Sequence, residues 1–128
     1  MLVLPIKKQW FDMILSGEKK EEYREIKPYY TKRFSKVGLL MEEIAGFGRD
    51  ECNNVIINFK PSTTDRTCQI LFRNGYSSES PSFVAKLSVT IGEGNPDWGA
   101  EPGIKYYVLH IKEITNTYKC KVGQVNKD

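Results

Sequence analysis

A charged segment, Gly-Glu-Lys-Lys-Glu-Glu-Tyr-Arg at residues 17–24, holds side chains that could recognise a polar ligand. If it is extended, alternation places Glu22 and Arg24 on one face, about 7 Å apart, and Lys19 enters from the preceding turn. A carboxylate between two cations stays ionised. The cations suit phosphate or carbonyl oxygens, and Glu22 can accept a hydrogen bond from an amino group of a base. The segment therefore predicts a polar binding site.

The same alternation has a second interpretation. Charges that alternate along the edge strand of a sheet commonly form an exposed ladder of ion pairs, which prevents aggregation. From the residues alone, this ladder and a lined site both remain open. In either case we expect Glu18, Lys20 and Glu21 to lie at the surface.

Two elements must position this segment. Residues 2–6 are a short apolar run that predicts a first strand, and residues 7–16 carry apolar side chains four positions apart, which predicts a helix. Gly17 fits the position just past a helix C-terminus, where positive φ costs little. Lys7 lies at the helix start, where the helix dipole disfavours a cation, which indicates another role for it. The strand itself is expected at residues 21–26.

The rest of the chain is rich in expected strands. Residues 54–59 are β-branched and almost wholly apolar, which predicts a buried strand, and residues 68–74 are expected to form a hairpin with them. Residues 29–47 look irregular and partly helical, and residues 92–103 form a long loop. The tail after about residue 115 is expected to fray, with its lysines Lys119, Lys121 and Lys127 solvated. Two more strands are expected at residues 83–91 and 104–114.

The composition restricts the function classes. The chain has 128 residues, which fits a single domain, and its net charge of +3 permits a nucleic-acid partner without requiring one. Three cysteines and one histidine, without a Cys-x-x-Cys motif, argue against a disulfide framework, a zinc site or any other metal site. The first residues are too short an apolar run for a signal peptide, and no stretch reaches membrane-spanning length. We expect a cytoplasmic protein without a cofactor; its oligomeric state stays open.

Gly17, Lys19, Glu22 and Arg24 follow the pattern G-x-K-x-x-E-x-R, which resembles the signature of the ASCH domain, a relative of the PUA RNA-binding fold. The likeness extends over most of residues 2–114. It includes the helix lead-in, the segment Phe-Arg-Asn-Gly-Tyr and the closing loop with the last strand. The resemblance implies an α+β fold: a PUA-like β-barrel of about five to six strands with one or two flanking helices, spanning residues 1–128 as one domain.

The resemblance also implies a cleft beside the barrel that holds RNA or a nucleoside. Carried over to this sequence, the motif residues that line it are Lys19, Glu22 and Arg24, and Lys7 is expected as a fourth member of the wall. Single-stranded RNA recognition usually needs aromatic stacking surfaces, and the candidates are Trp98, Tyr106 and Tyr107. His110 is expected to be structural.

Three functions follow from the resemblance. The first is binding of RNA or a nucleotide through Lys7, Lys19, Glu22 and Arg24. The second is hydrolysis, because some small relatives remove the acyl group of N4-acetylcytidine and ribonuclease activity is attached to others; Lys19 and Glu22 would be catalytic. Glu22, however, stands where the amidohydrolases have a threonine, and we expect it to raise the pKa of Lys19. The third is an adaptor that binds proteins, as in transcription coactivators.

Overall fold

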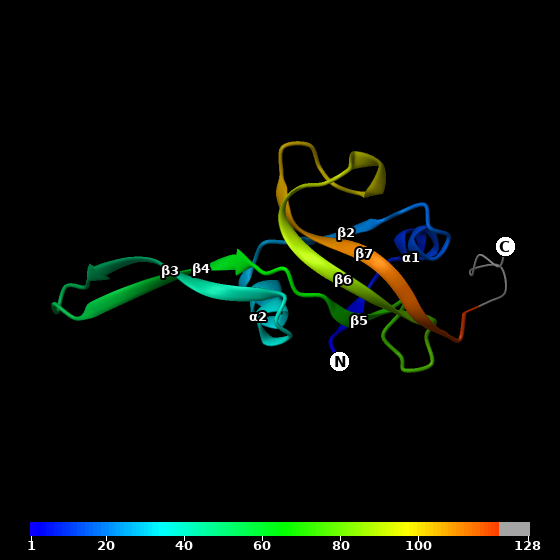
Figure 1. Cartoon of the computed structure of the whole chain (residues 1–128), viewed down its shortest axis with the longest axis horizontal. Helices are drawn as coiled ribbons and strands as arrows, with labels where there is room; N and C mark the ends of the chain where they lie inside the picture. The colour runs from blue at the N-terminus through cyan, green and yellow to red at the C-terminus, as the bar shows by residue number, and fades with distance from the viewer. Residues whose placement is uncertain (121–128) are drawn as a thin grey trace.

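The computed structural model describes residues 1–120. Within them the chain forms two α-helices, one short 3₁₀ helix and seven strands (Figure 1). In chain order these are β1 (Val3–Pro5), α1 (Lys8–Leu15), β2 (Glu21–Glu25), α2 (Pro28–Lys36), β3 (Leu40–Arg49), β4 (Val55–Thr63), β5 (Cys68–Arg73), β6 (Ser82–Glu93), η1 (Pro96–Trp98) and β7 (Lys105–Tyr118).

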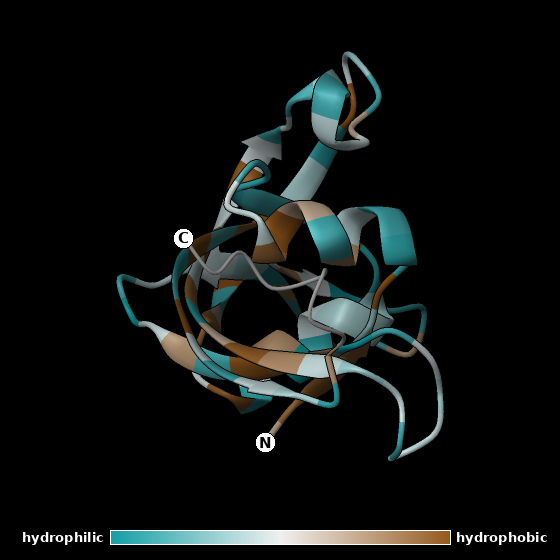
Figure 2. Ribbon diagram, turned by 90° about the vertical axis from the view of Figure 1, so that its right-hand side faces the viewer, coloured by the Kyte–Doolittle hydropathy of each residue, from teal (hydrophilic) through white to brown (hydrophobic). Residues whose placement is uncertain are grey.

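Five strands make one mixed sheet in the order β1-β5-β6-β7-β2. β1 runs parallel to β5, and every other pair is antiparallel. Figure 2 shows this sheet curving around an apolar interior. β1 and β2 are its two edges, and within residues 1–120 they do not pair with each other. The expected α+β class is therefore confirmed, whereas the sheet is not closed into a barrel by backbone pairing.

The core lies between the curved sheet and the two helices. Phe83 of β6 is fully buried and packs against Phe11 of α1 and Phe72 of β5, with ring centroids 5.1 and 5.2 Å apart. On the other side, Phe34 of α2 meets Tyr107 of β7 edge to face at 5.5 Å. Each helix therefore anchors itself to the sheet through one buried aromatic ring.

The largest correction concerns residues 54–59, which were expected to be buried and paired with residues 68–74. The structure pairs β4 with β3 instead, as a two-stranded arm that extends away from the sheet (Figure 1). β5 pairs with β1 and β6. The side chains of Val55 and Phe59 are 58% and 57% exposed, so the expected burial is wrong. An apolar run predicts a strand, but it does not identify the strand that will pair with it.

The region around the arm also differs from the expectation. Residues 29–47, expected to be irregular and partly helical, contain most of α2, which confirms the helical part, followed by most of β3. The sequence did not indicate β3, because it contains Gly46 and Gly48 and glycine is depleted in strands. The last strand continues to Tyr118, past the expected fraying point near residue 115. Lys121 and Lys127, which were expected to be solvated, lie outside the described residues.

The buried and exposed aromatic residues should differ sharply in stability measurements. We expect Phe83→Ala to lower the free energy of unfolding by about 3–5 kcal/mol, because it leaves a cavity beside the rings of Phe11 and Phe72. The control is Tyr76→Ala, whose side chain is 92% exposed, with an expected effect within about 0.5 kcal/mol. Urea denaturation followed by circular dichroism measures both. Equal losses for the two variants would contradict this description of the core.

Candidate functional site

The three charged motif residues form one buried ionic cluster. Glu22 Oε1 lies 3.2 Å from Lys19 Nζ, and Glu22 Oε2 lies 2.8 Å from Arg24 Nη2. The side chains of all three are less than a tenth exposed. The cluster is therefore not an exposed ladder of ion pairs, although its residues come from the edge strand β2 and the turn before it.

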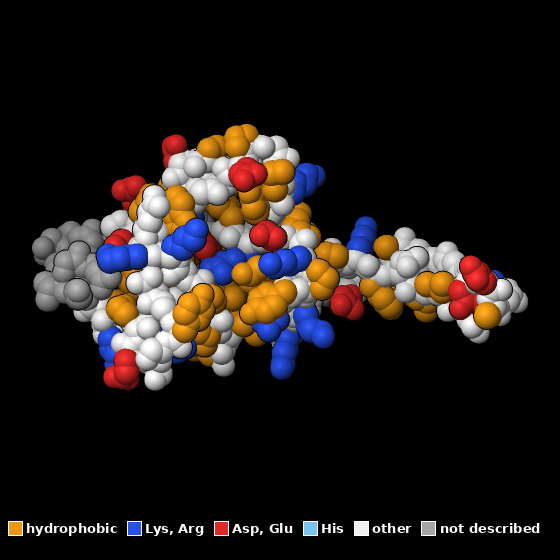
Figure 3. Space-filling view, turned by 180° about the vertical axis from the view of Figure 1, so that it is seen from behind, with side chains coloured by type: hydrophobic (Ala, Val, Ile, Leu, Met, Phe, Trp, Pro, Cys, Tyr) orange, Lys and Arg blue, Asp and Glu red, His pale blue; other side chains and the backbone are white. Residues whose placement is uncertain are grey.

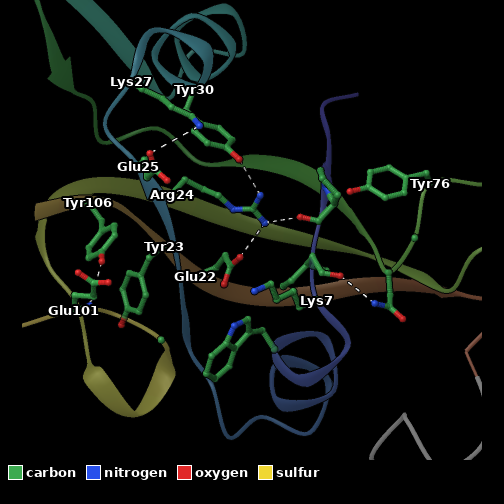
Figure 4. Close-up of a pocket in the computed structure, with 16 residues that line it drawn as sticks. Lys7, Glu22, Tyr23, Arg24, Glu25, Lys27, Tyr30, Tyr76, Glu101 and Tyr106 are labelled. Carbon is green, nitrogen blue, oxygen red and sulfur yellow. Dashed lines mark hydrogen bonds and ion pairs between the residues drawn. The ribbon is translucent and has the colours of Figure 1, made fainter. Parts of the chain in front are cut away.

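Arg24 connects three elements of the fold (Figure 4). From β2, its Nη2 donates a hydrogen bond to the backbone oxygen of Pro5 on β1 at 2.7 Å, and its Nη1 donates to the Tyr30 hydroxyl of α2 at 3.3 Å. Its guanidinium carbon lies 5.7 Å from the centre of the Tyr30 ring. The guanidinium group thus bridges the two edges of the sheet and holds α2 beside them.

Lys19 is the most deeply buried member of the cluster. Its Nζ donates a hydrogen bond to the backbone oxygen of Trp98 at 2.7 Å and lies 4.8 Å from the ring centres of both Trp10 and Tyr23. Burial lowers the pKa of Lys19, and the charge of Glu22 only partly offsets this effect. The expected rise in the pKa is therefore wrong, because desolvation of the ammonium outweighs its ion pair.

The loop between β6 and β7 covers Lys19. The Tyr23 hydroxyl donates to Glu21 Oε1 at 2.7 Å and accepts a hydrogen bond from the backbone N–H of Asn95 in the loop at 2.8 Å. Burial is the main cause that raises the pKa of Tyr23. A Cβ at Gly94 would lie 2.5 Å from the Tyr23 ring, so only glycine permits this approach. The loop and β2 therefore fit closely around Lys19.

An open pocket of about 810 Å³ lies over the cluster. Glu22 and Arg24 line it, and so does Lys7 (Figure 4). Lys19 is not among the lining residues; it supports Glu22 from behind. The other charged residues of the wall are Glu25, Lys27 and Glu101, and the aromatic ones are Trp10, Tyr23, Tyr30, Tyr76 and Tyr106.

The expected stacking residues have three different places. Tyr106 lines the pocket, and its hydroxyl accepts a hydrogen bond from the Glu101 backbone N–H at 3.1 Å. Tyr107 is fully buried in the core, so it is not available as a stacking surface. Trp98 contributes its backbone oxygen to Lys19. His110 lies 2.7 Å from Thr90 Oγ1 through Nε2 and 3.4 Å from Glu21 through Nδ1.

Sequence reasoning missed several residues of the pocket wall. Trp10 was assigned only to the apolar stripe of a helix, yet its ring lies beside Lys19 at the pocket. Tyr30 comes from α2, Lys27 from the position just before that helix, and Tyr76 from the loop after β5. The segment Asn-Gly-Tyr was the sequence signal that could have identified Tyr76 as a residue of the wall. Asn74 donates its side-chain N–H to the Ile6 backbone oxygen at 3.0 Å, which holds this loop close to the end of β1.

Other functional features are limited. Within residues 1–120, no three His, Cys, Asp or Glu residues gather closely enough to bind a metal ion. The same part of the chain contains no helix with the length and apolar character needed to cross a membrane. Cys52, Cys68 and Cys120 are free thiols. Comparison of the chain with protein-family models, curated proteins and solved structures finds no match.

The ionic cluster should be sensitive to loss of its central carboxylate. We expect Glu22→Gln to lower the free energy of unfolding by about 3–5 kcal/mol, because it leaves two buried cations without their counter-charge. Glu25→Gln on the same strand is the matched control, since the Glu25 side chain is 73% exposed and lies 3.8 Å from Lys27. That change should cost less than about 1 kcal/mol. Chemical denaturation of both variants measures the difference, and a Glu22→Gln protein as stable as the control would contradict it.

Proposed function

We propose that this chain is an ASCH-type domain of the PUA-like superfamily that binds RNA or a nucleoside in the pocket over Glu22 and Arg24. The observation that carries the proposal is the combination of a buried, preorganised carboxylate–guanidinium pair with a wall of aromatic rings around one open pocket. Its volume of about 810 Å³ lies within the range of about 300–1,000 Å³ that is usual for ligand pockets.

The chemistry of a nucleobase matches this wall. Glu22 can accept from an exocyclic amino group and Arg24 can donate to a base carbonyl or a phosphate. The rings of Trp10, Tyr30 and Tyr76 offer faces on which a base can stack. A single-stranded or free base fits best, because its Watson–Crick edge is not occupied by a partner.

A PUA-like barrel is part of the same proposal. The hydrogen bond from Arg24 to the Pro5 backbone oxygen crosses the gap between the sheet edges β2 and β1. In this proposal the side chain performs the closure that a backbone ladder performs elsewhere. The site and the closure of the sheet then share one residue. A cytoplasmic location also belongs to the proposal, and the three free thiols support it.

The charge beside the pocket favours RNA over an isolated nucleoside. Residues 27–36, which include α2, contain four Lys or Arg and no Asp or Glu. Lys27 lines the pocket, and Lys32, Arg33 and Lys36 line a second pocket together with residues 1–3. An RNA strand with one base in the pocket would place its neighbouring phosphates along this helix. Each lysine or arginine there would add electrostatic attraction to the binding free energy.

Binding should respond to the pocket lysines. We expect short single-stranded RNA to bind with an affinity that falls as salt rises, and Lys7→Ala or Lys27→Ala to lower the log–log salt slope by about 0.7 each. Lys8→Ala is the matched control, because Lys8 neighbours Lys7 in sequence but pairs with Asp12 outside the pocket. Fluorescence polarisation at several salt concentrations measures these slopes. An equal effect of Lys8→Ala would show that the charge, and not the pocket, governs binding.

A hydrolase is the second candidate, and the lowered pKa of Lys19 favours it. A neutral amine can take a proton from water that attacks the acyl carbon of N4-acetylcytidine, with release of acetate and cytidine. Two features oppose this function. Glu22 replaces the hydroxyl of the known amidohydrolases, and Lys19 Nζ is engaged by Trp98 and Glu22 behind the pocket wall. A ribonuclease would depend on the same two residues.

The hydrolase candidate makes a prediction with a defined direction in pH. A base must be unprotonated, so release of cytidine from N4-acetylcytidine should increase with pH and level off below pH 10.5, the ordinary lysine value. Lys19→Met should abolish turnover, whereas Lys20→Met, at the exposed neighbouring position, should leave it unchanged. Chromatography of the reaction mixture measures cytidine. Turnover that persists in Lys19→Met excludes Lys19 as the base.

A further inference from the structure

The β3–β4 arm carries an unpartnered apolar face. The register places Ile44 opposite Phe59 and Phe47 opposite Ile57, and Val55 follows on the same side of β4. These five side chains are between 44% and 71% exposed. Figure 3 shows hydrophobic side chains along the arm, which stands away from the rest of the molecule. An isolated two-stranded sheet is at best marginally stable in water, so this face needs a cover.

A charged residue lies at each end of the apolar face. Glu42 lies on the same side of β3 at the base of the arm, opposite Pro61, and Arg49 lies there at the tip, opposite Val55. Among residues 1–120, neither Glu42 nor Arg49 has a salt-bridge partner. Along the arm from its base to its tip, this face therefore carries an acidic residue, then the apolar residues, then a basic residue. A second arm turned antiparallel presents the reverse order.

The turn at the tip holds the arm in a defined shape. Asp50 Oδ1 accepts hydrogen bonds from the backbone N–H groups of Cys52 and Asn54 at 2.9 and 2.8 Å. Arg49 Nη1 donates to the Asn53 backbone oxygen at 2.9 Å, which keeps the guanidinium group at the tip. A face that is ordered before contact loses less conformational entropy on association.

We propose that two copies of this chain associate through their β3–β4 arms, packed face to face and antiparallel about a two-fold axis. The five apolar side chains of each copy then cover those of the other. Each Arg49 reaches Glu42 of the other copy, so the contact contains two ion pairs at its rim. This dimer is independent of the RNA-binding proposal, because no residue of the arm lines the pocket.

The available area agrees with a reversible dimer. Five partly exposed side chains at on the order of 100 Å² each remove about 500 Å² per copy, or about 1,000 Å² in total, which reaches the lower bound of specific interfaces. The face offers few polar groups to recognise a different protein, whereas its two terminal charges match those of a second copy. A homodimer is therefore the expected assembly.

Sedimentation velocity over a range of concentrations tests the dimer. The wild-type chain of 14.7 kDa should shift to twice its mass, and Ile57→Lys should raise the dimer dissociation constant at least about tenfold, because it buries a charge in the interface. Ile56→Lys is the matched control: it lies on the opposite face of the same strand with a similar exposure, 41% against 44%. The Ile56→Lys variant should dimerise like wild type. A wild type that remains monomeric at millimolar concentration, or equal losses in both variants, overturns the proposal.

A charge exchange tests the antiparallel arrangement separately from the fold. Glu42→Arg alone and Arg49→Glu alone each place like charges together, and each should weaken the homodimer about tenfold. A mixture of the two variants should restore dimers, because each rim contact then joins opposite charges. Both changes in one chain should restore them as well. Far-ultraviolet circular dichroism checks that each variant is folded. If neither the mixture nor the double variant regains wild-type affinity, the two arms do not pack in this arrangement.

Discussion

The interaction on which the site and the sheet both depend is the ion pair between Arg24 and Glu22. The sheet has two unpaired edges, β1 and β2, and the Arg24 side chain spans them through its hydrogen bond to the Pro5 backbone oxygen. A guanidinium group can occupy this nearly buried position because Glu22 neutralises it at 2.8 Å. The Tyr30 hydroxyl accepts from the same group, which adds a polar contact to the packing of α2 through Phe34. Removal of either charge would therefore disturb the architecture together with the pocket.

Burial of three charges requires the surrounding protein to satisfy them. Lys19 achieves this with Glu22, the Trp98 backbone oxygen and two aromatic faces. The loop after β6 supplies that oxygen, and it can approach because glycine stands where a side chain would collide with Tyr23. The cluster is thereby rigid on its inner side and open toward the pocket on its outer side. Such preorganisation allows a polar site to bind a ligand without first rearranging.

The arm follows a different constraint. The core side of the sheet is covered by α1 and α2, and the apolar residues of β5, β6 and β7 are buried beneath them. β3 and β4 receive no such cover beyond the base of the arm, so residues as apolar as those of the core remain in water. Their placement separates two surfaces of one small chain: a polar pocket built over the sheet edges, and an apolar face held away from it.

Most of the individual helices and strands could be predicted from the sequence. The apolar pattern predicted α1, β5, β6 and β7 to within a few residues, because those elements pack with the period that the pattern encodes. The spacing in residues 17–24 likewise predicted that Glu22 and Arg24 share a face. Only tertiary structure decided the rest. The partner of β4, the exposure of its apolar side chains and the entry of Trp10, Lys27 and Tyr30 into the pocket all depend on contacts between distant segments. The pKa of Lys19 is the clearest case: the sequence showed its neighbouring carboxylate, but the burial that outweighs it comes from a loop nearly eighty residues away.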